Sequence, residues 1–356
     1  MGMTQKVRKG EELDEESLKM YLADKGLIKS ANSELNVTQF PTGYSNLTYS
    51  LHIEDKSYVL RRPPKGAIKR GHDMGREFKV LSKLNKQFNK APKVFTYAED
   101  DSIIGSSFFI MEKIEGIVLS TKEAYKRKIP PKGYQDIAGQ WLSTFIELHA
   151  LDYHEVGLGD LGKPEGYVGR QVSNWGVQYL RVATDEIKEA GKVMKWMQDS
   201  QPKDYNSCMI HNDFKYDNVV FKDETWKCLK AVLDWEMCTI GDPLMDLGTS
   251  LGYWLMDNDH EMIVESLPSP TSLSGNPSRL ELVSMYERMS GNMVSNLVFY
   301  YVYGLFKIAV IVQQIYYRYN KGLTSDKRFA KLDNTAKILC LTAWQAIQKN
   351  SIEELF

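Results

Sequence analysis

The sequence predicts an α+β protein of two lobes, with a small antiparallel β-sheet in the first lobe and mostly helices in the second. Strand-like apolar runs dominate up to residue 112, and helical patterns dominate after residue 116, apart from one hairpin near 219–233. The 356 residues suffice for two domains or one bilobal unit, and 43% hydrophobic content is ample for a buried core. We therefore expect a first lobe at 1–112, a hinge at 113–116 and a second lobe at 117–356.

The first lobe is predicted to begin with a short amphipathic helix. Leu18, Tyr21 and Leu22 share one face of it, and Gly26 ends it. Strands with turns at 41–43 and 54–56 follow, then a helix and a further apolar strand. The stretches concerned are VTQFPTGYSNLTYSLHI and SYVLRR for the strands, MGREFKVLSKLNKQF for the helix and SSFFIMEKIEG for the last strand.

Capping signals mark two helix starts in the second lobe. Asp242 followed by proline is typical of a helix N-cap, and Ser278 with Glu281 suits a capping box. The apolar run 296–320 is interrupted by Lys307 and falls short of the ~20 apolar residues that a membrane-spanning helix needs. We therefore expect it to form a buried helix. Trp235 and Trp254 are also expected in the core.

One polar stretch, MIHNDFKYDN at 209–218, precedes the predicted hairpin. The start of one antiparallel strand lies beside the end of the next, so Asn218 and Asp234 should meet at one end of the hairpin. An amide oxygen beside a carboxylate is a hard-oxygen site suited to Mg²⁺. Asp213 is placed to accept a proton, and Lys215 to meet a phosphate. This combination of groups describes phosphoryl transfer.

These residues resemble known motifs. HNDFKYDN resembles the protein-kinase catalytic loop H-x-D-x-x-x-x-N, and LDWEMCTIGDPLMDLG resembles the metal-binding stretch of the aminoglycoside phosphotransferase and choline kinase superfamily. YVLR stands at the kinase V-A-I-K strand, GREFKVL at its helix and FFIMEKIEG at its hinge. SNLTY, LRRPP and DWEMCTIGDP are most similar to the kinase-like domains fused to acyl-CoA dehydrogenases. The resemblance covers about 40–251 and implies a protein-kinase-like fold.

The resemblance implies roles for the residues of the cluster. Asp213 would act as the catalytic base or orient the substrate hydroxyl, and Lys215 would contact the transferred phosphate. Asn218 and Asp234 would bind magnesium. The cofactors would be ATP or GTP with Mg²⁺. Residues 117–356 would then carry the catalytic loop and the substrate site.

The first lobe would bind the nucleotide. The glycine-poor stretch PTGYSNLTYSL is either a simple hairpin turn or a phosphate cover that uses backbone N–H groups with two side chains. Arg61 replaces the usual lysine, and Glu77 would orient it. The predicted nucleotide-binding residues are Gly43, Ser45, Asn46, Val59, Arg61 and Glu77, with Met111, Glu112 and Ile114 in the adenine hinge.

The pairing of Arg61 with Glu77 also follows from periodicity. Glu77, Leu81, Leu84 and Phe88 would share one helix face, and an acid on an apolar face needs a buried partner. Strand alternation turns Arg61 inward together with Val59. If the strand register slipped by one residue, Arg62 would take this place instead.

Other polar residues have structural interpretations. His211 is expected to hold the catalytic loop through hydrogen bonds to the backbone. Asp242 and Asp246 are expected to be structural, and Glu236 either supports the metal site or lies at the surface.

Three functions remain open, and a small-molecule kinase is favoured. A protein kinase would carry a longer segment after its metal-binding acid, whereas only six residues separate Asp234 from Gly241 and no A-P-E follows. A non-catalytic, pseudokinase-like nucleotide-binding module would fit Arg61 and the glycine-poor loop, but the intact acids oppose it. The acids of 256–265 could suit a polycationic aminoglycoside, whereas the closer resemblance favours a hydroxyacyl-type metabolite. The sequence does not predict an oligomeric state.

Composition narrows the remaining possibilities. A net charge of −1 offers no basic field for nucleic acid, and no membrane association is expected. The four cysteines form no C-x-x-C pair, which favours a reduced, cytoplasmic protein. The polar start MGMTQKVRKGEELDEE lacks the apolar core of a signal peptide.

Overall fold

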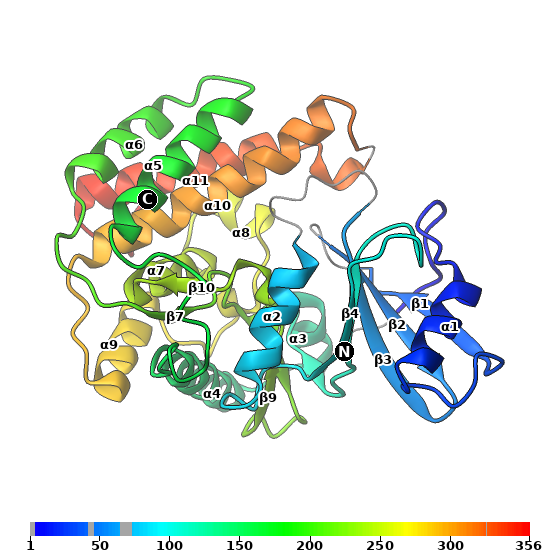
Figure 1. Ribbon diagram of the computed structural model, residues 1–356. Coiled ribbons are helices and arrows are strands. Elements are labelled where there is room, and N and C mark those ends of the chain that lie inside the picture. The colour runs from blue at the N-terminus through cyan, green and yellow to red at the C-terminus, as the bar shows by residue number, and fades with distance from the viewer. Residues whose placement is uncertain (1–3, 42–45, 65–72, 325) are drawn as a thin grey trace.

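The computed structural model describes residues 4–41, 46–64, 73–324 and 326–356. It has the predicted α+β character, with a five-stranded antiparallel sheet beside a large helical lobe (Figure 1). The strand order is β1-β2-β3-β5-β4. The strands are β1 Leu35–Gln39, β2 Leu47–Ile53, β3 Lys56–Arg62, β4 Val94–Ala98 and β5 Phe108–Glu112. Of these, β4 was not predicted. The turn predicted at 41–43 extends beyond the described residues.

The two faces of this sheet carry different helices. Helix α1 (Glu15–Asp24) buries Leu18 and Leu22 in one hydrophobic cluster with Leu60 of β3. Helix α2 (Met74–Leu84) packs in another cluster, with Val59, the neighbour of Leu60. Figure 1 accordingly shows α2 between the sheet and the helical lobe, with α1 on the opposite side. The alternation along β3 therefore turns every second side chain toward the helical lobe.

Helix α2 ends four residues earlier than its apolar pattern suggested. The predicted helix ran to Phe88, but the observed one stops at Leu84. A turn follows, in which the Asn85 side chain donates a hydrogen bond to the carbonyl oxygen of Ala91. Phe88 is still fully buried, so the turn delivers it to the same core.

The helical lobe surrounds two small sheets, β6-β8-β9 and β7-β10. Its strands are β6 Ile117–Val118, β7 Cys208–Ile210, β8 Val219–Phe221, β9 Leu229–Val232 and β10 Thr239–Gly241, of which β8 and β9 form the predicted hairpin. The helices are α3 Thr121–Arg127, α4 Pro131–His149, α5 Tyr167–Val182, α6 Lys188–Asp199, α7 Pro243–Tyr253, α8 Glu261–Ser266, α9 Arg279–Ser290, α10 Leu297–Asn320 and α11 Leu332–Lys349. Short 3-10 turns lie at Tyr216–Asn218, Trp235–Met237, Pro270–Ser272 and Lys327–Phe329.

The capping predictions are confirmed. The Asp242 carboxylate accepts the backbone N–H of Leu244 at the start of α7. Ser278 and Glu281 form the reciprocal capping box at the start of α9. Trp235 and Trp254 are both buried in the core, as expected.

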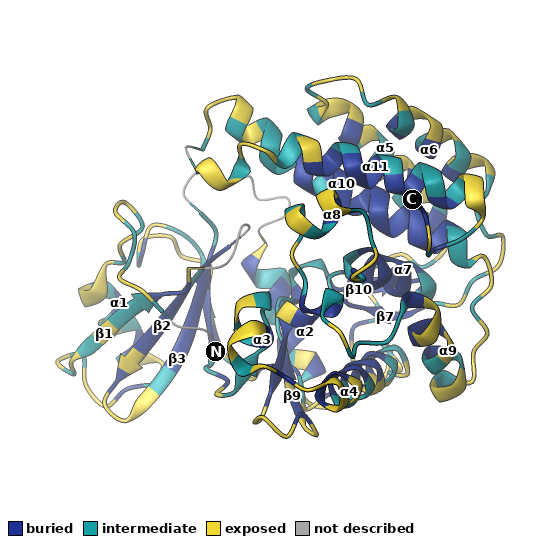
Figure 2. Ribbon diagram, turned by 180° about the vertical axis from the view of Figure 1, so that it is seen from behind, coloured by how far each residue is buried: buried dark blue, intermediate teal, exposed yellow. Residues whose placement is uncertain are grey.

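Helix α10 forms the centre of the helical lobe. By length and composition it could cross a membrane, so the expectation that its apolar run is too short for this was wrong. However, 78% of its most apolar window is buried inside the protein (Figure 2). It meets α7 at two glycines: a Cβ on Gly248 would lie 2.1 Å from the Tyr300 carbonyl oxygen, and one on Gly304 would lie 2.0 Å from the Gly248 carbonyl oxygen. Only glycine permits this approach, so α7 and α10 pack backbone to backbone. The prediction of a buried core helix is confirmed.

Candidate active site

The polar stretch that follows β7 brings three predicted site residues together. The Asp213 Oδ2 atom lies 2.7 Å from the amide nitrogen of Asn218 and 3.1 Å from the Lys215 ammonium nitrogen. Asn218 reaches this position through the 3-10 turn Tyr216–Asn218, which enters β8 directly. The amide of Asn218 and the ammonium of Lys215 therefore both contact the same carboxylate oxygen of Asp213.

A buried acid holds the backbone of this loop. The two carboxylate oxygens of Asp246 accept the N–H groups of His211 and Asn212, each at 2.7 Å. Burial acts to raise the pKa of Asp246, but the hydrogen bonds from the His149 side chain and the His211 backbone help to lower the pKa below its ordinary value. The structural role expected for Asp246 is confirmed, and that role is to hold the backbone of the predicted catalytic loop.

His211 ties the loop to the end of strand β9. Its Nδ1 atom accepts the backbone N–H of Asp213 at 3.3 Å, so Nε2 carries the proton that it donates to the Leu233 carbonyl oxygen at 3.0 Å. Burial lowers the pKa of His211, which favours this neutral form. The predicted scaffolding role is confirmed.

Asn218 and Asp234 meet at the end of the hairpin, as predicted. Val219 pairs with Val232, and the Leu233 N–H donates to the Asn218 carbonyl oxygen at 2.7 Å. Asp234 then adopts a left-handed backbone with φ 66°, which turns the chain into the 3-10 turn that follows. The two side chains thus come from adjacent strand ends.

The donor set at this end fits magnesium. The side-chain nitrogen of Asn218 donates to Asp213, which leaves the side-chain oxygen available to a cation beside the Asp234 carboxylate. Burial acts to raise the pKa of Asp234, but the Arg61 charge and hydrogen bond lower it overall, so this carboxylate is ionised at neutral pH. No group of three or more His, Cys, Asp or Glu that could hold a metal occurs within the described residues. Two protein oxygens suffice, because Mg²⁺ commonly keeps waters and takes further oxygens from phosphates.

Arg61 lies at the junction of the two lobes. Its guanidinium donates to Glu77 at 2.8 Å and to Asp234 at 3.0 Å, and both Arg61 and Glu77 are buried. Burial raises the pKa of Glu77 to about 7 even though the Arg61 charge opposes this shift. The predicted pairing of Arg61 with Glu77 is therefore confirmed.

Arg62 points to the opposite side of the sheet. Its guanidinium donates to the carbonyl oxygens of Glu11 and Ile104 and to the Tyr49 hydroxyl. The strand register that turns Arg61 toward the site is thus settled, and the alternative assignment to Arg62 is wrong.

Glu236 supports the site rather than lying at the surface. Its carboxylate accepts hydrogen bonds from Arg61, at 3.3 Å, and from the Asn46 amide. Arg76 of α2 donates to the carbonyl oxygens of Glu236 and Cys238, at 3.2 and 2.6 Å. Asn46 is buried here, whereas Gly43 and Ser45, the other predicted phosphate-cover residues, lie outside the described residues.

The predicted hinge residues lie at the end of β5. Met111 pairs with Val59 of β3, and both are buried in the cluster that faces α2. Ile114 packs with Val220 and Ala231 of the hairpin, and the Glu112 carboxylate accepts the Lys93 N–H at 2.6 Å. Their contacts with a nucleotide stay a prediction.

Two residues that contact the site, Tyr253 and Lys307, were not predicted from the sequence. The Tyr253 ring at the end of α7 has its centroid 4.6 Å from the Lys215 ammonium nitrogen. Burial acts to lower the pKa of Lys215, but Asp213 raises it above its ordinary value. Lys307 of α10 donates to the carbonyl oxygen of Asn212 at 2.8 Å. A lysine inside an otherwise apolar helix signals such a buried partner.

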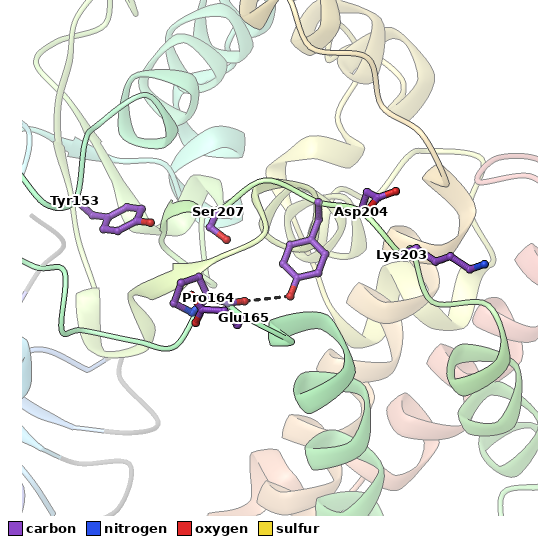
Figure 3. A pocket seen from close by; sticks show the side chains of 7 residues that line it. Tyr153, Pro164, Glu165, Lys203, Asp204 and Ser207 are labelled. Atoms are coloured by element: carbon purple, nitrogen blue, oxygen red, sulfur yellow. Dashed lines mark hydrogen bonds between the residues drawn. The ribbon is translucent and has the colours of Figure 1, made fainter.

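One surface pocket lies apart from this cluster. Its cavity volume is about 440 Å³, and none of the residues lining it is a predicted site residue (Figure 3). Tyr205 and Pro164 both line the pocket. The Tyr205 hydroxyl donates to the Pro164 carbonyl oxygen at 3.0 Å and accepts the Tyr167 N–H at 2.7 Å. The remaining lining residues are Tyr153, Glu165, Lys203, Asp204 and Ser207.

Comparisons with known proteins place the chain among phosphotransferases. Residues 36–267 match the model of the phosphotransferase enzyme family. The chain is similar to acyl-CoA dehydrogenase family member 11 of Gallus gallus, with 31% identity over 99% of this chain and 47% of the relative. The chain thus spans about half the length of such curated relatives.

Solved structures share the fold. A candidate aminoglycoside phosphotransferase from Ralstonia eutropha has 27% identity and a TM-score of 0.77, with 95% of this chain and 99% of that chain covered. The aminoglycoside phosphotransferase APH(4)-Ia, in complex with AMP-PNP and hygromycin B, has 15% identity and a TM-score of 0.59 over 93% of this chain and 98% of that chain. The lower identity of the second structure shows the fold alone.

Proposed function

The chain belongs to the phosphotransferase enzyme family, and we propose that it moves the γ-phosphoryl group of ATP, or of GTP, to a hydroxyl group of a small molecule. The observation that carries this proposal is the meeting of Asp213, Lys215 and Asn218 within hydrogen-bonding distance, beside Asp234 and Arg61. Phosphoryl transfer relies on positioning and on charge stabilisation, and these groups supply both. The AMP-PNP complex of a structural neighbour supports ATP as the donor.

In the proposed reaction the acceptor hydroxyl oxygen forms a bond to the γ-phosphorus, and the bond from that phosphorus to the β–γ bridging oxygen breaks. The hydroxyl proton passes to the Asp213 carboxylate, whose orientation is set by Asn218 and Lys215. The ammonium of Lys215 neutralises charge on the transferred group. Asn218 and Asp234 would hold Mg²⁺, which neutralises charge on the phosphate oxygens when bound.

Arg61 is proposed to contact the nucleotide phosphates from the first lobe. Its guanidinium already spans Glu77 of α2 and Asp234 of the metal-binding turn. A planar guanidinium can hold a carboxylate and a phosphate together, which a lysine ammonium does less well. Val59 and the hinge residues 111–114 would then enclose the base.

The acceptor is proposed to be a hydroxyacyl-type metabolite rather than an aminoglycoside. Part of the acidic segment 256–265 is engaged within the protein, because Asp259 pairs with the buried Arg279. His260 caps α8 by accepting the N–H of Met262. Relatives named as acyl-CoA dehydrogenases support an acyl-bearing substrate. We propose a cytoplasmic location and no nucleic-acid or membrane partner.

The rival functions fit the geometry less well. A protein kinase positions its peptide on a long segment, whereas here the chain passes from Asp234 through a 3-10 turn straight into β10. A non-catalytic module would not require an acid at position 213. Here the Asp213 carboxylate is half-buried and forms an ion pair with Lys215, an arrangement suited to catalysis.

The test is a screen of hydroxylated metabolites for Mg²⁺-dependent ADP formation with ATP. We expect Asp213→Asn to lower turnover by about 10²–10⁴-fold with near-normal ATP affinity, because it removes the proton acceptor and keeps the shape. Asp223→Asn, in the exposed hairpin turn, is the matched control and should leave turnover unchanged. Wild-type turnover in Asp213→Asn, or the same loss in Asp223→Asn, would refute the assignment.

A further inference from the structure

Lys307 lies near the middle of α10 and is 1% exposed. Its neighbours Phe306 and Ile308 are equally buried apolar residues. No carboxylate lies within 4.0 Å of its ammonium nitrogen in the described part of the chain. Burying a cation without an ion pair is costly, and an apolar side chain would fill the same space without that cost. The amine therefore calls for an explanation beyond packing.

The partner of Lys307 is a single residue of the catalytic loop. Its nitrogen donates to the carbonyl oxygen of Asn212 at 2.8 Å and to the Asn212 side-chain oxygen at 3.0 Å. The N–H of the same residue is held by Asp246 at 2.7 Å. An acid from α7 and an amine from α10 thus hold both backbone polar groups of Asn212, the residue directly before Asp213.

Asn212 has an unusual backbone conformation. Its φ is 67°, in the left-handed region that non-glycine residues seldom adopt. Such a conformation persists only when surrounding contacts hold it, and it tends to occur at functional sites. The Asn212 amide also donates to the Met237 carbonyl oxygen at 3.1 Å, in the turn that follows Asp234. Through Asn212, Lys307 is therefore connected to the turn that follows Asp234 as well as to the loop that contains Asp213.

The two helices that supply this clamp pack directly against each other. Gly248 and Gly304 let α7 and α10 touch backbone to backbone, which sets the positions of Asp246 and Lys307 relative to each other. We propose that Lys307 is a positioning residue, which holds Asn212 in its left-handed conformation and so aims the Asp213 carboxylate at the acceptor hydroxyl. The proposal concerns the catalytic loop of the phosphotransferase and rests on the proposed function for its effect on rate.

The charges around Lys307 are consistent with this role. Burial lowers its pKa to about 8, although Asp246 and Asp213 act to raise it, and Lys215 acts in the same direction as burial. An amine donates hydrogen bonds whether it is charged or neutral. The clamp on Asn212 therefore operates on both sides of this pKa.

The chain offers a matched control on the same helix. Gln313 is 2% exposed, and its amide donates to the Val182 carbonyl oxygen and to the Thr184 hydroxyl, both at 3.0 Å. It resembles Lys307 in burial and in the number of bonds, but it contacts no residue of the catalytic loop. Lys307→Met and Gln313→Met each remove a buried donor and keep an apolar stem.

The first measurement is amide hydrogen exchange of the peptide covering 211–214, in the full chain without ligand. We expect about tenfold faster exchange in Lys307→Met, because the loss of one buried hydrogen-bonding partner weakens local closure by about that factor. Gln313→Met should leave this peptide unchanged. Equal exchange in both variants would overturn the proposal. This readout needs no substrate, so an absence of kinase activity in the wild type would refute the proposed function while leaving this test intact.

The second measurement is the rate of Mg²⁺-dependent ATP hydrolysis, with water as acceptor, and AMP-PNP affinity. Lys307→Met should lower the rate by about 10–100-fold, as expected for a misplaced catalytic group, and change the nucleotide Kd little. Lys307→Gln keeps an N–H donor, so its rate and its slow exchange should both lie between those of Lys307→Met and the wild type. If Lys307→Met does not fold, both measurements are made on Lys307→Gln instead. The positioning role would be refuted if the rate fell no more than in Gln313→Met, or if Lys307→Gln were as slow as Lys307→Met.

Discussion

Arg61 is the cation on which the junction of the two lobes depends, and Arg61→Met tests this. The side chains of Arg61 and Glu77 are 8% and 1% exposed, so the substitution leaves a fully buried carboxylate without its partner. Breaking a buried ion pair by removing one partner costs about 3–5 kcal/mol. Asp234 and Glu236 also lose their cation, but they are 36% and 18% exposed and can be hydrated in part. At about pH 8.5, where Glu77 with its pKa of about 7 is ionised in the wild type, we expect the free energy of unfolding to fall by about 3–5 kcal/mol, mainly because of Glu77.

Glu77→Gln should be much milder, and the double variant shows why. With glutamine at 77, Arg61 still donates to Asp234 and Glu236, so we expect a loss of about 1–2 kcal/mol. In Arg61→Met/Glu77→Gln no buried charge remains at position 77. The double variant should therefore be destabilised no more than Arg61→Met alone, which corresponds to a coupling of about 1–3 kcal/mol.

The assay is urea unfolding followed by circular dichroism, with AMP-PNP affinity measured on the same samples. Arg62→Met is the control, because its guanidinium bonds to Glu11, Ile104 and Tyr49 on the other face of the sheet. It should be destabilising, additive with Glu77→Gln and without effect on nucleotide binding. Additive losses for Arg61 and Glu77, within about 0.5 kcal/mol, would refute the reasoning.

Three further substitutions test other parts of the structure. Asn218→Ala should weaken AMP-PNP binding only when Mg²⁺ is present, and an equal loss in a chelator would place the metal elsewhere. Burial raises the pKa of Asp242 to about 6, so its stabilising contribution, present below about pH 4, is lost as the pH rises through 6. The wild type should therefore lose about 2 kcal/mol relative to Asp242→Asn between pH 4 and 6, and a flat difference in unfolding free energy would contradict this. Gly304→Ala should destabilise by about 3 kcal/mol or more, because its Cβ meets the Gly248 backbone, whereas Gly139→Ala in open space should not; equal melting temperatures would refute the close helix contact.

The sequence by itself predicted the parts of the site that depend on local order. The two strands of the hairpin follow each other along the chain, so antiparallel pairing alone brings Asn218 and Asp234 together. Strand alternation with a helix repeat likewise placed Arg61 opposite Glu77. The Asp242 cap follows from its neighbour Pro243 and needs no tertiary contact. These features were predictable because each rests on a short-range rule.

Tertiary structure decided the contacts that no local period encodes. Whether Glu236 would support the site or face solvent depended on where Arg61 and Asn46 came to lie. The early end of α2 came from a turn bond between Asn85 and Ala91, which local apolar spacing does not reveal.

The clamp on Asn212 is the clearest case of such a contact. Lys307 is 95 residues away along the chain, and the sequence showed it only as an interruption in an apolar run. It reaches Asn212 because the helices α7 and α10 meet at two glycines, which fixes the distance between their axes. The sequence thus predicted which groups would carry the chemistry and in what local order they stand. Only the packing of distant helices decided what holds those groups in place. A hydrogen bond such as the one from Lys307 to Asn212 is strong because both groups are removed from water, and that occurs only in the folded core.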